Sequence, residues 1–449
     1  MSEKMGSEKT RTIGLLGAIS IGIGGMVGGG IFAVLGEAVS LAHGATAMAF
    51  LFAGVVALFT SYSYAKLSVK YQSQGGTVTF IDKAFNHNLL SGSINLLLWL
   101  SYLVTIALYA VAFSSYAQTF FKGDSGLWLN HQWLNHLFIS LAILLPFAIN
   151  LISASIVGKS ETIIVVIKVV LLIIVIAASA SFVDVERLSY QHWGSSLSIV
   201  IAGMVIFVAY EGFELIANAS EDIKNPKVNL PRAFYGSVIL VVILYVLIAL
   251  ITVGTVPESE ILSAKDYALA VAAKPALGTV GFIVVSVAAL LATFSAINAT
   301  IYGNSRLAYI IAIEGELPKV MDSEKRNIPF MGVILTSVLS FLIANSISLR
   351  EISIIGSASF LLVFFIVNVA AYRLRDEINA NKVVIIFASL VSFAALIALL
   401  VHTYQNNPKA IVVFISFILV SVMFEAVYGK LVRKHLFHRA YDKSDKSTV

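Results

Sequence analysis

Long stretches of apolar residues, separated by short polar breaks, follow one another along the whole chain. A bilayer core about 30 Å thick requires about 20 apolar residues per helix, and stretches of this length recur from one end of the sequence to the other. The pattern therefore predicts an all-α polytopic membrane protein with 12 spans. The predicted spans lie near residues 12–40, 44–68, 89–121, 135–156, 162–182, 196–222, 232–256, 276–303, 328–346, 351–373, 382–403 and 409–430.

The distribution of Lys and Arg predicts how these spans are oriented. An even number of spans places both termini on the same side of the membrane. Of the 30 Lys and Arg residues, 23 fall on that side, six fall on the other, and Lys168 lies inside a span. Because cytoplasmic loops carry the excess of positive charge, the terminal segments 1–11 and 431–449 are predicted to be cytoplasmic, in a multi-pass protein of the inner or plasma membrane.

Composition excludes several other classes of protein. Hydrophobic residues make up 58% of the 449 residues and charged residues only 12%, whereas an average soluble domain has about 25% charged residues. The chain has no cysteine, which excludes disulfides and thiolate metal sites. Its net charge of +5 comes from basic residues in short loops rather than in one patch, so we expect no nucleic acid partner. The charged N-terminus leads into an apolar stretch too long for a signal peptide, so the first span is predicted to be retained.

The first span contains a glycine-rich segment, GIGGMVGGGIF, at residues 22–32. Glycine costs about 1 kcal/mol per helix position relative to alanine, so the consecutive residues Gly28, Gly29 and Gly30 are predicted to unwind the helix. Unwound backbone survives in a bilayer only where it lines a cavity in the protein. Its free amides can then bind an anionic group at the positive end of the half-helix that follows.

Close packing of helices is the alternative interpretation of these glycines. Gly24 with Gly28, and Gly25 with Gly29, both have the spacing of small residues at helix interfaces. The six glycines of the segment exceed what one packing face needs, which favours the break. A nucleotide-binding loop is excluded because no strand precedes the glycines.

The sixth span contains a second candidate break, where Glu211 and Glu214 flank Gly212 near the middle of the membrane. A carboxylate in hydrocarbon costs at least a few kcal/mol, so each must face a partner or a water-filled cavity. An internal ion pair or a protonated acid is the structural alternative. Further along, Asn225-Pro226 is predicted to end the helix, and Pro231 to lie in the first turn of the seventh span.

Interruptions five spans apart are the pattern expected of an inverted repeat. The first repeat would comprise residues 12–182, with helices 1 to 5, and the second residues 196–373, with helices 6 to 10. Two further helices, 11 and 12, would follow within 382–430.

One lysine, Lys168, lies inside the fifth span among aliphatic neighbours. It is about seven residues from the predicted cytoplasmic end, or roughly 10 Å deep at about 1.5 Å per residue. Desolvation disfavours the charged ammonium, so a lysine placed there can load and release a proton near neutral pH. Two alternatives stay open: the side chain can snorkel to the interface, or it can form a salt bridge with Glu211 or Glu214.

Three segments together resemble the amino acid-polyamine-organocation superfamily. They are GGMVGGGIF, AYEGFE followed by NASEDIKNPKVNLPRA, and NATIYGNSRLAYIIAIEGELPKVM at 298–321. The similarity extends over roughly residues 10–430 and, within the superfamily, the chain resembles an archaeal proton-coupled carrier of broad amino acid specificity. It implies the fold first seen in the bacterial leucine transporter, with discontinuous helices 1 and 6.

The resemblance also implies roles for individual residues. Amides of the first break would hold a substrate carboxylate, carbonyls of both breaks would take the amino group, and an aromatic side chain would cover the site. These residues are Gly28, Gly29 and Gly30 for the amides, Met26, Val27 and Phe207 for the carbonyls, and Phe207 or Tyr210 for the cover.

The coupling ion implied by the resemblance is a proton, with no sodium and no other cofactor or metal. Lys168 matches a lysine that occupies the position of a sodium ion in sodium-coupled relatives, close to the backbone of Gly24. From the eighth span, Thr293, Ser295 and Asn298 lie near the corresponding sodium-site region.

Glu211 departs from the relatives' pattern, because an uncharged residue is expected at that position. If it is ionised, a negative charge beside the amino-group pocket favours a cationic amino acid, an amine or a polyamine. If it is protonated, it can act as a second proton carrier, with Glu214 nearby.

The sequence therefore favours a secondary transporter that imports amino acids with protons by alternating access. Its expected partners are the small-molecule substrate and the lipid bilayer. An exchanger or importer of cationic amino acids, amines or polyamines is the alternative. A membrane-embedded enzyme is disfavoured because none of the eight histidines forms an H-E-x-x-H arrangement. A receptor is disfavoured because no sizeable extramembrane domain is expected.

Overall fold

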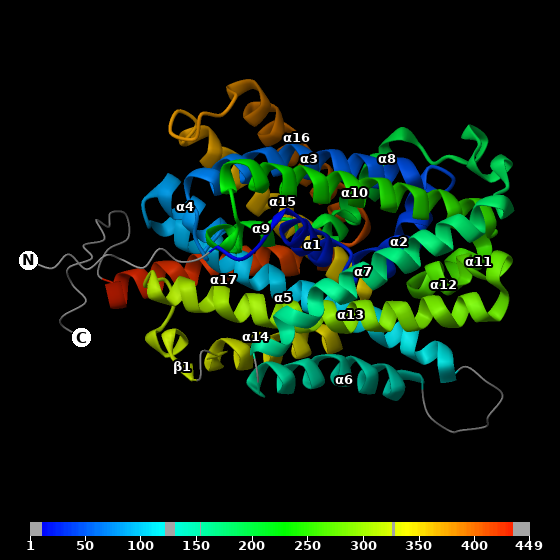
Figure 1. The fold of residues 1–449 in the computed structure, drawn as a ribbon, viewed down its shortest axis with the longest axis horizontal. Helices are drawn as coiled ribbons and strands as arrows, with labels where there is room; N and C mark the ends of the chain where they lie inside the picture. The colour runs from blue at the N-terminus through cyan, green and yellow to red at the C-terminus, as the bar shows by residue number, and fades with distance from the viewer. Residues whose placement is uncertain (1–10, 122–130, 153, 326–327, 434–449) are drawn as a thin grey trace, which may run out of the picture.

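The computed structural model describes residues 11–121, 131–152, 154–325 and 328–433. Long helices run side by side along the longest axis of the molecule (Figure 1). Within the described residues, nine helices are long and apolar enough to cross a membrane. They are α3 (Thr46–Lys70), α5 (Leu89–Gln118), α6 (His131–Ile152), α7 (Ala154–Ser179), α10 (Pro226–Thr255), α13 (Lys274–Ile313), α15 (Leu349–Arg373), α16 (Lys382–Asn406) and α17 (Pro408–Tyr428).

Two further spans are broken in the middle. Helix α1 (Leu15–Met26) meets α2 (Gly30–Ala42) at an angle of 48°. Helix α8 (Ser196–Val205) is followed by the short helices η5 (Phe207–Tyr210) and α9 (Leu215–Asn218), bent from it by 53°. Both predicted interruptions therefore fall at bent helix pairs.

Counting each bent pair as one span gives up to 11 candidate spans within the described part of the chain. A shorter apolar helix of 17 residues, α14 (Phe330–Ser346), lies where a further span was predicted. The all-α polytopic fold is thus confirmed. The division into two inverted repeats stays a prediction.

Three helices extend beyond their predicted ends. Helix α7 begins at Ala154 instead of 162, α10 begins at Pro226 instead of 232, and α13 ends at Ile313 instead of 303. Each extension contains polar residues that interrupt the apolar pattern. Pro226 suits the first helical position because the amide that it lacks would have no partner there, whereas Pro231 lies inside the helix rather than in its first turn.

Short elements fill the two ends of the helical bundle. The α-helices among them are α4 (Thr77–Phe85), α11 (Glu258–Ala264) and α12 (Ala268–Ala272). The 3-10 helices are η1 (Thr119–Phe121), η2 (Ala180–Phe182), η3 (Val185–Leu188), η4 (Tyr190–His192), η6 (Ser220–Asp222), η7 (Lys265–Tyr267) and η8 (Lys319–Asp322), and η9 (Gly429–Arg433) is a π-helical turn. Strands β1 (Glu324–Lys325) and β2 (Ile328–Pro329) pair antiparallel.

Helix α5 lies at the centre of the bundle. In its most apolar window 89% of the residues are buried, against 22% for the corresponding window of α17 and 28% for that of α7. The outer helices turn large apolar side chains such as Ile174, Leu390 and Met423 away from the protein, as lipid-facing helices do. A residue on α5 is therefore well placed to contact several spans at once.

The segment that precedes α1 is joined to the end of the second broken span. The amides of Thr12 and Ile13 donate to the carbonyl of Asp222 at 3.0 and 2.9 Å, and the amide of Lys224 donates to that of Ile13 at 2.8 Å. Arg11 donates to the carbonyl of Ile223 at 3.1 Å. We call residues 11–13 with 222–224 the terminal strap.

Candidate functional site

The two broken spans touch each other at their breaks. A Cβ atom added to Gly25 would lie 2.7 Å from the Cα and carbonyl oxygen of Gly212, and one added to Gly212 would lie 2.4 Å from the carbonyl carbon of Gly25. Gly212 also has a φ of +118°, which glycine adopts far more readily than other residues. Only glycine therefore allows this contact.

Two buried carboxylates hold the second break in place. Glu214 accepts hydrogen bonds from the Gly212 amide and from the Tyr102 hydroxyl, both at 2.8 Å. Glu211 accepts one from the Thr105 hydroxyl at 2.6 Å. Both glutamates are almost fully buried, and the hydroxyl partners come from α5, where residues three apart lie on one face.

The same face of α5 also reaches the first break, through Tyr109. A Cβ atom on Gly29 would lie 2.3 Å from Cδ1 of this ring, so the ring covers that glycine. The Tyr109 hydroxyl lies 3.5 Å from the Gly25 carbonyl oxygen. We call Tyr102, Thr105 and Tyr109 the α5 hydroxyl face. Sequence reasoning missed these three residues, although their spacing of three and four along an apolar span is a signal for a polar face.

A small cavity of about 20 Å³ lies where the α5 hydroxyl face meets the breaks. By volume it has room for about one water molecule. Among the described residues that line it, Glu211 is the acidic one, and none is Lys or Arg. The wall is formed by Gly25, Tyr102, Tyr109, Glu211, Gly212, Leu215, Asn218, Ala299, Thr300, Gly303, Asn304 and Leu307.

A larger cavity of about 550 Å³ continues from the small one. The two share five wall residues, among them Leu215, Asn218 and Leu307. The larger cavity also touches Ile13 and Asp222 of the terminal strap. It therefore connects the breaks to the end of the molecule at which α1 begins.

The other end of the molecule is closed over the breaks. Glu37 of α2 is 6% exposed and pairs with Arg350 of α15 at 2.8 Å and with Lys265 of η7 at 3.8 Å. A Cβ atom on Gly36 would lie 2.1 Å from the Lys265 carbonyl oxygen. Close backbone contact and ion pairing thus join α2 to this end, which we call the closed end.

The structure places the predicted aromatic cover away from the small cavity. The Tyr210 hydroxyl donates to the Phe50 carbonyl at 2.8 Å, and the Phe207 ring packs edge-on against Phe364. The carbonyl of Met26 accepts a hydrogen bond from the Tyr245 hydroxyl at 2.7 Å. Of the residues predicted to bind substrate, Glu211 is the one in the cavity wall.

The three consecutive glycines of the first break are not all unwound. The non-helical residues are Val27, Gly28 and Gly29, and Gly30 already belongs to α2. A Cβ atom on Gly28 would lie 2.7 Å from the Ala296 Cβ, and one on Gly30 would lie 2.7 Å from the Ala209 Cα. The segment is therefore both unwound and closely packed, so the helix break and the close packing of small residues occur together.

Lys168 is 2% exposed and lies on α7, which packs against α1 and α13. Because α7 begins at Ala154, the lysine is farther from the helix start than the predicted seven residues. Such burial argues against snorkelling. Gly24 belongs to α1, and the three predicted residues of the eighth span belong to α13.

Those three residues have different surroundings. Thr293 is buried and its hydroxyl donates to the Ala289 carbonyl of its own helix at 2.7 Å. Ser295 is also buried. Asn298 accepts a hydrogen bond from the Asn150 amide of α6 at 2.8 Å. Only Thr293 and Ser295 are thus enclosed to the degree expected for an ion-site region.

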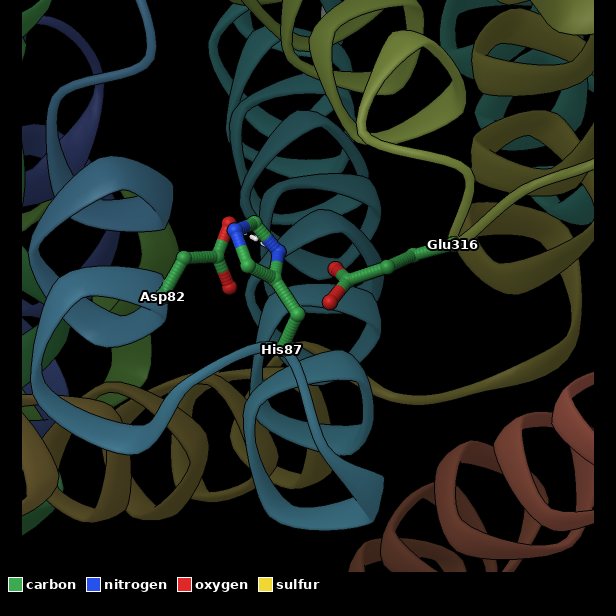
Figure 2. Close-up of side chains that lie close together, drawn as sticks. All are labelled: Asp82, His87 and Glu316. Carbon is green, nitrogen blue, oxygen red and sulfur yellow. Dashed lines mark ion pairs between the residues drawn. The ribbon is translucent and has the colours of Figure 1, made fainter. Parts of the chain in front are cut away.

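A separate polar cluster is formed by α4 and by the segments that follow α4 and α13. Figure 2 shows the side chains of Asp82, His87 and Glu316 turned toward one another, with their ligand atoms within 4.8 Å. The Asn95 amide donates to both carboxylates, at 2.9 and 2.7 Å, and His87 Nδ1 lies 3.6 Å from Asp82 Oδ2. Such a set can hold a divalent ion. A protonated histidine between two carboxylates satisfies the same geometry without one.

Several of the known proteins that resemble this chain are named as transporters. Residues 17–428 match the family described as Amino acid permease. The inner membrane transport protein YbaT of Escherichia coli K12 is 34% identical over 423 residues, which is 94% of this chain and 97% of that protein. An uncharacterized protein of Methanocaldococcus jannaschii is 33% identical over 438 residues, 97% of this chain and 99% of that protein. The serine/threonine exchanger SteT of Bacillus subtilis is 24% identical over 396 residues, 83% of this chain and 86% of that protein.

The family match covers nearly all of the described residues, including both breaks and the α5 hydroxyl face. Two relatives exceed 30% identity over almost their whole length. The chain therefore belongs to the amino acid permease family of the amino acid-polyamine-organocation superfamily, and it is a multi-pass membrane transporter of amino acids rather than an enzyme.

Proposed function

We propose that this transporter imports amino acids together with protons, independently of sodium, by alternating access. Both termini would face the cytoplasm, so the larger cavity would be the cytoplasmic exit. The observation that supports proton coupling is the burial of Lys168 on α7, a helix that packs against α1 and α13.

A buried lysine suits proton coupling for an electrostatic reason. Its ammonium supplies one positive charge inside the protein, which is what a bound sodium ion supplies in sodium-coupled carriers. Because low-dielectric surroundings disfavour the charged form, the charge can be lost to one side of the membrane and regained from the other. The resemblance that places this lysine beside Gly24 gives the same role.

The breaks offer complementary groups to the backbone of an amino acid. The free amides at the start of α2 carry the positive end of the helix dipole and suit a carboxylate. Carbonyls at the end of α1 suit an ammonium. The contact between Gly25 and Gly212 places both breaks at one point, about which the half-helices can turn.

Uptake of radiolabelled amino acids into proteoliposomes tests the coupling. We expect uptake to rise with an inward proton gradient and to ignore sodium. Lys168→Ala should abolish the gradient-driven component, whereas Lys70→Ala, which removes an exposed lysine at the end of α3, should keep it. Uptake that follows sodium, or full proton-driven uptake by Lys168→Ala, would contradict the assignment.

A second candidate is transport of cationic amino acids, amines or polyamines. It is favoured by Glu211, because this carboxylate lines the small cavity and no Lys or Arg of the described part of the chain does. Binding of arginine, alanine and putrescine to the wild type and to Glu211→Gln separates the two candidates. If the protein transports cationic substrates, we expect Glu211→Gln to weaken the binding of arginine and putrescine more than the binding of alanine. An unchanged order of preference excludes this second candidate.

A further inference from the structure

The small cavity cannot accept an amino acid as it stands. With a volume of about 20 Å³, it has room for about one water molecule. Some group in its wall must therefore move when substrate enters. Gly25 and Gly212 are fixed by their mutual contact, and the Tyr102 hydroxyl and the Glu211 carboxylate are held by short hydrogen bonds to Glu214 and Thr105.

Tyr109 differs from these groups in what it contacts. Its hydroxyl lies 3.5 Å from the Gly25 carbonyl, which is longer than a strong hydrogen bond. The ring of the same side chain covers Gly29. The hydroxyl of one side chain thus lies against a carbonyl of the first break, and its ring covers a second residue of the same break.

The carbonyl of Gly25 and the amide of Gly29 are the two kinds of group that the backbone of an amino acid would use. Its ammonium needs a carbonyl and its carboxylate needs an amide. We propose that Tyr109 takes the place of the substrate's ammonium and carboxylate in the empty transporter, and that the substrate binds by displacing it. This proposal rests on the proposed function, since it assumes that the ligand is an amino acid.

Displacement of Tyr109 by substrate predicts the direction in which removal of its hydroxyl changes substrate affinity. If the hydroxyl competes with substrate, its removal leaves the empty site less well satisfied and tightens binding. One modest hydrogen bond corresponds to roughly a twofold to fivefold change in a dissociation constant. If the hydroxyl instead contacts bound substrate, the same substitution weakens binding.

The chain provides a closely matched control on the same face of α5. The Tyr116 hydroxyl lies 3.4 Å from the Phe32 carbonyl of α2, and this tyrosine is fully buried. Tyr116→Phe therefore removes the same group, from the same helix, opposite another carbonyl of the first broken span. It lies outside the wall of the small cavity.

The test is equilibrium binding of radiolabelled alanine, serine and arginine to the purified full-length chain. We expect Tyr109→Phe to bind two to five times more tightly than the wild type and Tyr116→Phe to bind as the wild type does. Thermal unfolding without ligand should show a lower midpoint for Tyr109→Phe and a larger rise on adding substrate. Tyr109→Leu, which also lacks the hydroxyl, serves if Tyr109→Phe does not fold.

The possible failures can be told apart. A wild type that binds an amino acid, with equal or weaker binding by Tyr109→Phe, overturns the displacement proposal alone. A wild type that binds none of the three amino acids overturns the proposed function, and the displacement proposal with it.

Discussion

Gly25 and Gly212 show what a single hydrogen atom in place of a side chain permits. Their backbones approach so closely that a Cβ on either would lie under 3 Å from the other. The sequence predicted unwinding near these glycines from helix propensity, but the contact itself depends on the relative placement of two spans. Because the two glycines are far apart in the sequence, the sequence pattern does not reveal that they lie in contact.

Substituting either glycine should be far more damaging than an ordinary glycine-to-alanine change. We expect Gly25→Ala to destabilise the folded protein by about 1–3 kcal/mol, as overpacking of a core does, and to abolish uptake. Gly212→Ala adds the strain of a positive φ. Thermal unfolding in detergent and uptake in proteoliposomes measure both effects.

Gly236→Ala is the matched control for this prediction. Gly236 lies within α10, and a Cβ there would meet only the Ile19 side chain, at 3.5 Å, which is ordinary van der Waals contact. Because alanine favours helix over glycine, this variant should be neutral or slightly stabilised. Equal behaviour of Gly25→Ala and Gly236→Ala would show that the two breaks do not touch.

Among the elements, α5 orders the site, because one of its faces reaches both breaks. Tyr102 and Thr105 hold the carboxylates of the second break, and Tyr109 covers the first. The broken spans supply flexible backbone, while the continuous central helix supplies fixed side chains. This division explains how unwound segments keep a defined geometry.

Tyr102→Phe should loosen the second break. It leaves Glu214 with one hydrogen bond fewer in a buried place, which costs about 1–3 kcal/mol. Tyr71→Phe is the control, because its hydroxyl also bonds a carboxylate, Glu377 at 2.6 Å, but at an exposed position. Exposed pairs contribute about 0–1 kcal/mol. Thermal unfolding of both variants measures the two losses of stability. Equal losses would show that the Tyr102 hydroxyl does not hold the second break more firmly than an exposed hydrogen bond would.

The sequence predicted helical elements better than their ends or their faces. Apolar stretches long enough to cross a bilayer are unambiguous, so the polytopic fold was predicted from them. The two breaks were predicted from the glycines of the first span and from Glu211, Gly212 and Glu214 in the sixth. Polar residues at helix ends carry no such signal, and α7 and α10 begin earlier than expected. The α5 hydroxyl face was missed because an apolar helix buried on all sides does not reveal which residues point at the site. Glu211 was predicted as a site residue because a carboxylate inside a membrane span is costly and therefore usually marks a functional site.

On the scale of the whole molecule, the two ends are in different states. The larger cavity opens toward the terminal strap, whereas Glu37, Arg350 and Lys265 close the opposite end. An open and a closed end are what alternating access requires at any one time. The ion pairs should therefore bias the equilibrium toward the form described here.

Breaking the Glu37 pairs should shift that equilibrium. The chain has no cysteine, so one introduced at Ser115, whose hydroxyl lies 3.3 Å from Asp266 beneath the closed end, is the single target of a membrane-impermeant thiol reagent. We expect Glu37→Gln to raise its labelling rate severalfold. Exchange of the charges, Glu37→Arg with Arg350→Glu, should restore slow labelling.

Glu186→Gln, which neutralises an exposed glutamate of η3, is the control for that experiment. It changes the net charge by the same amount without touching α2. A labelling rate for Glu37→Gln no higher than for Glu186→Gln would mean that the ion pairs do not hold the closed end.

The terminal strap has a consequence for the way the protein is made. Arg11 and Ile223 lie 212 positions apart, so the first span leaves the ribosome long before its partner segment exists. At about 5–20 residues per second, the wait is on the order of 10–40 s. The broken first helix must therefore stay in the bilayer without its strap until almost half the chain has been synthesised, which makes this interval the one in which the nascent protein is most exposed to misfolding.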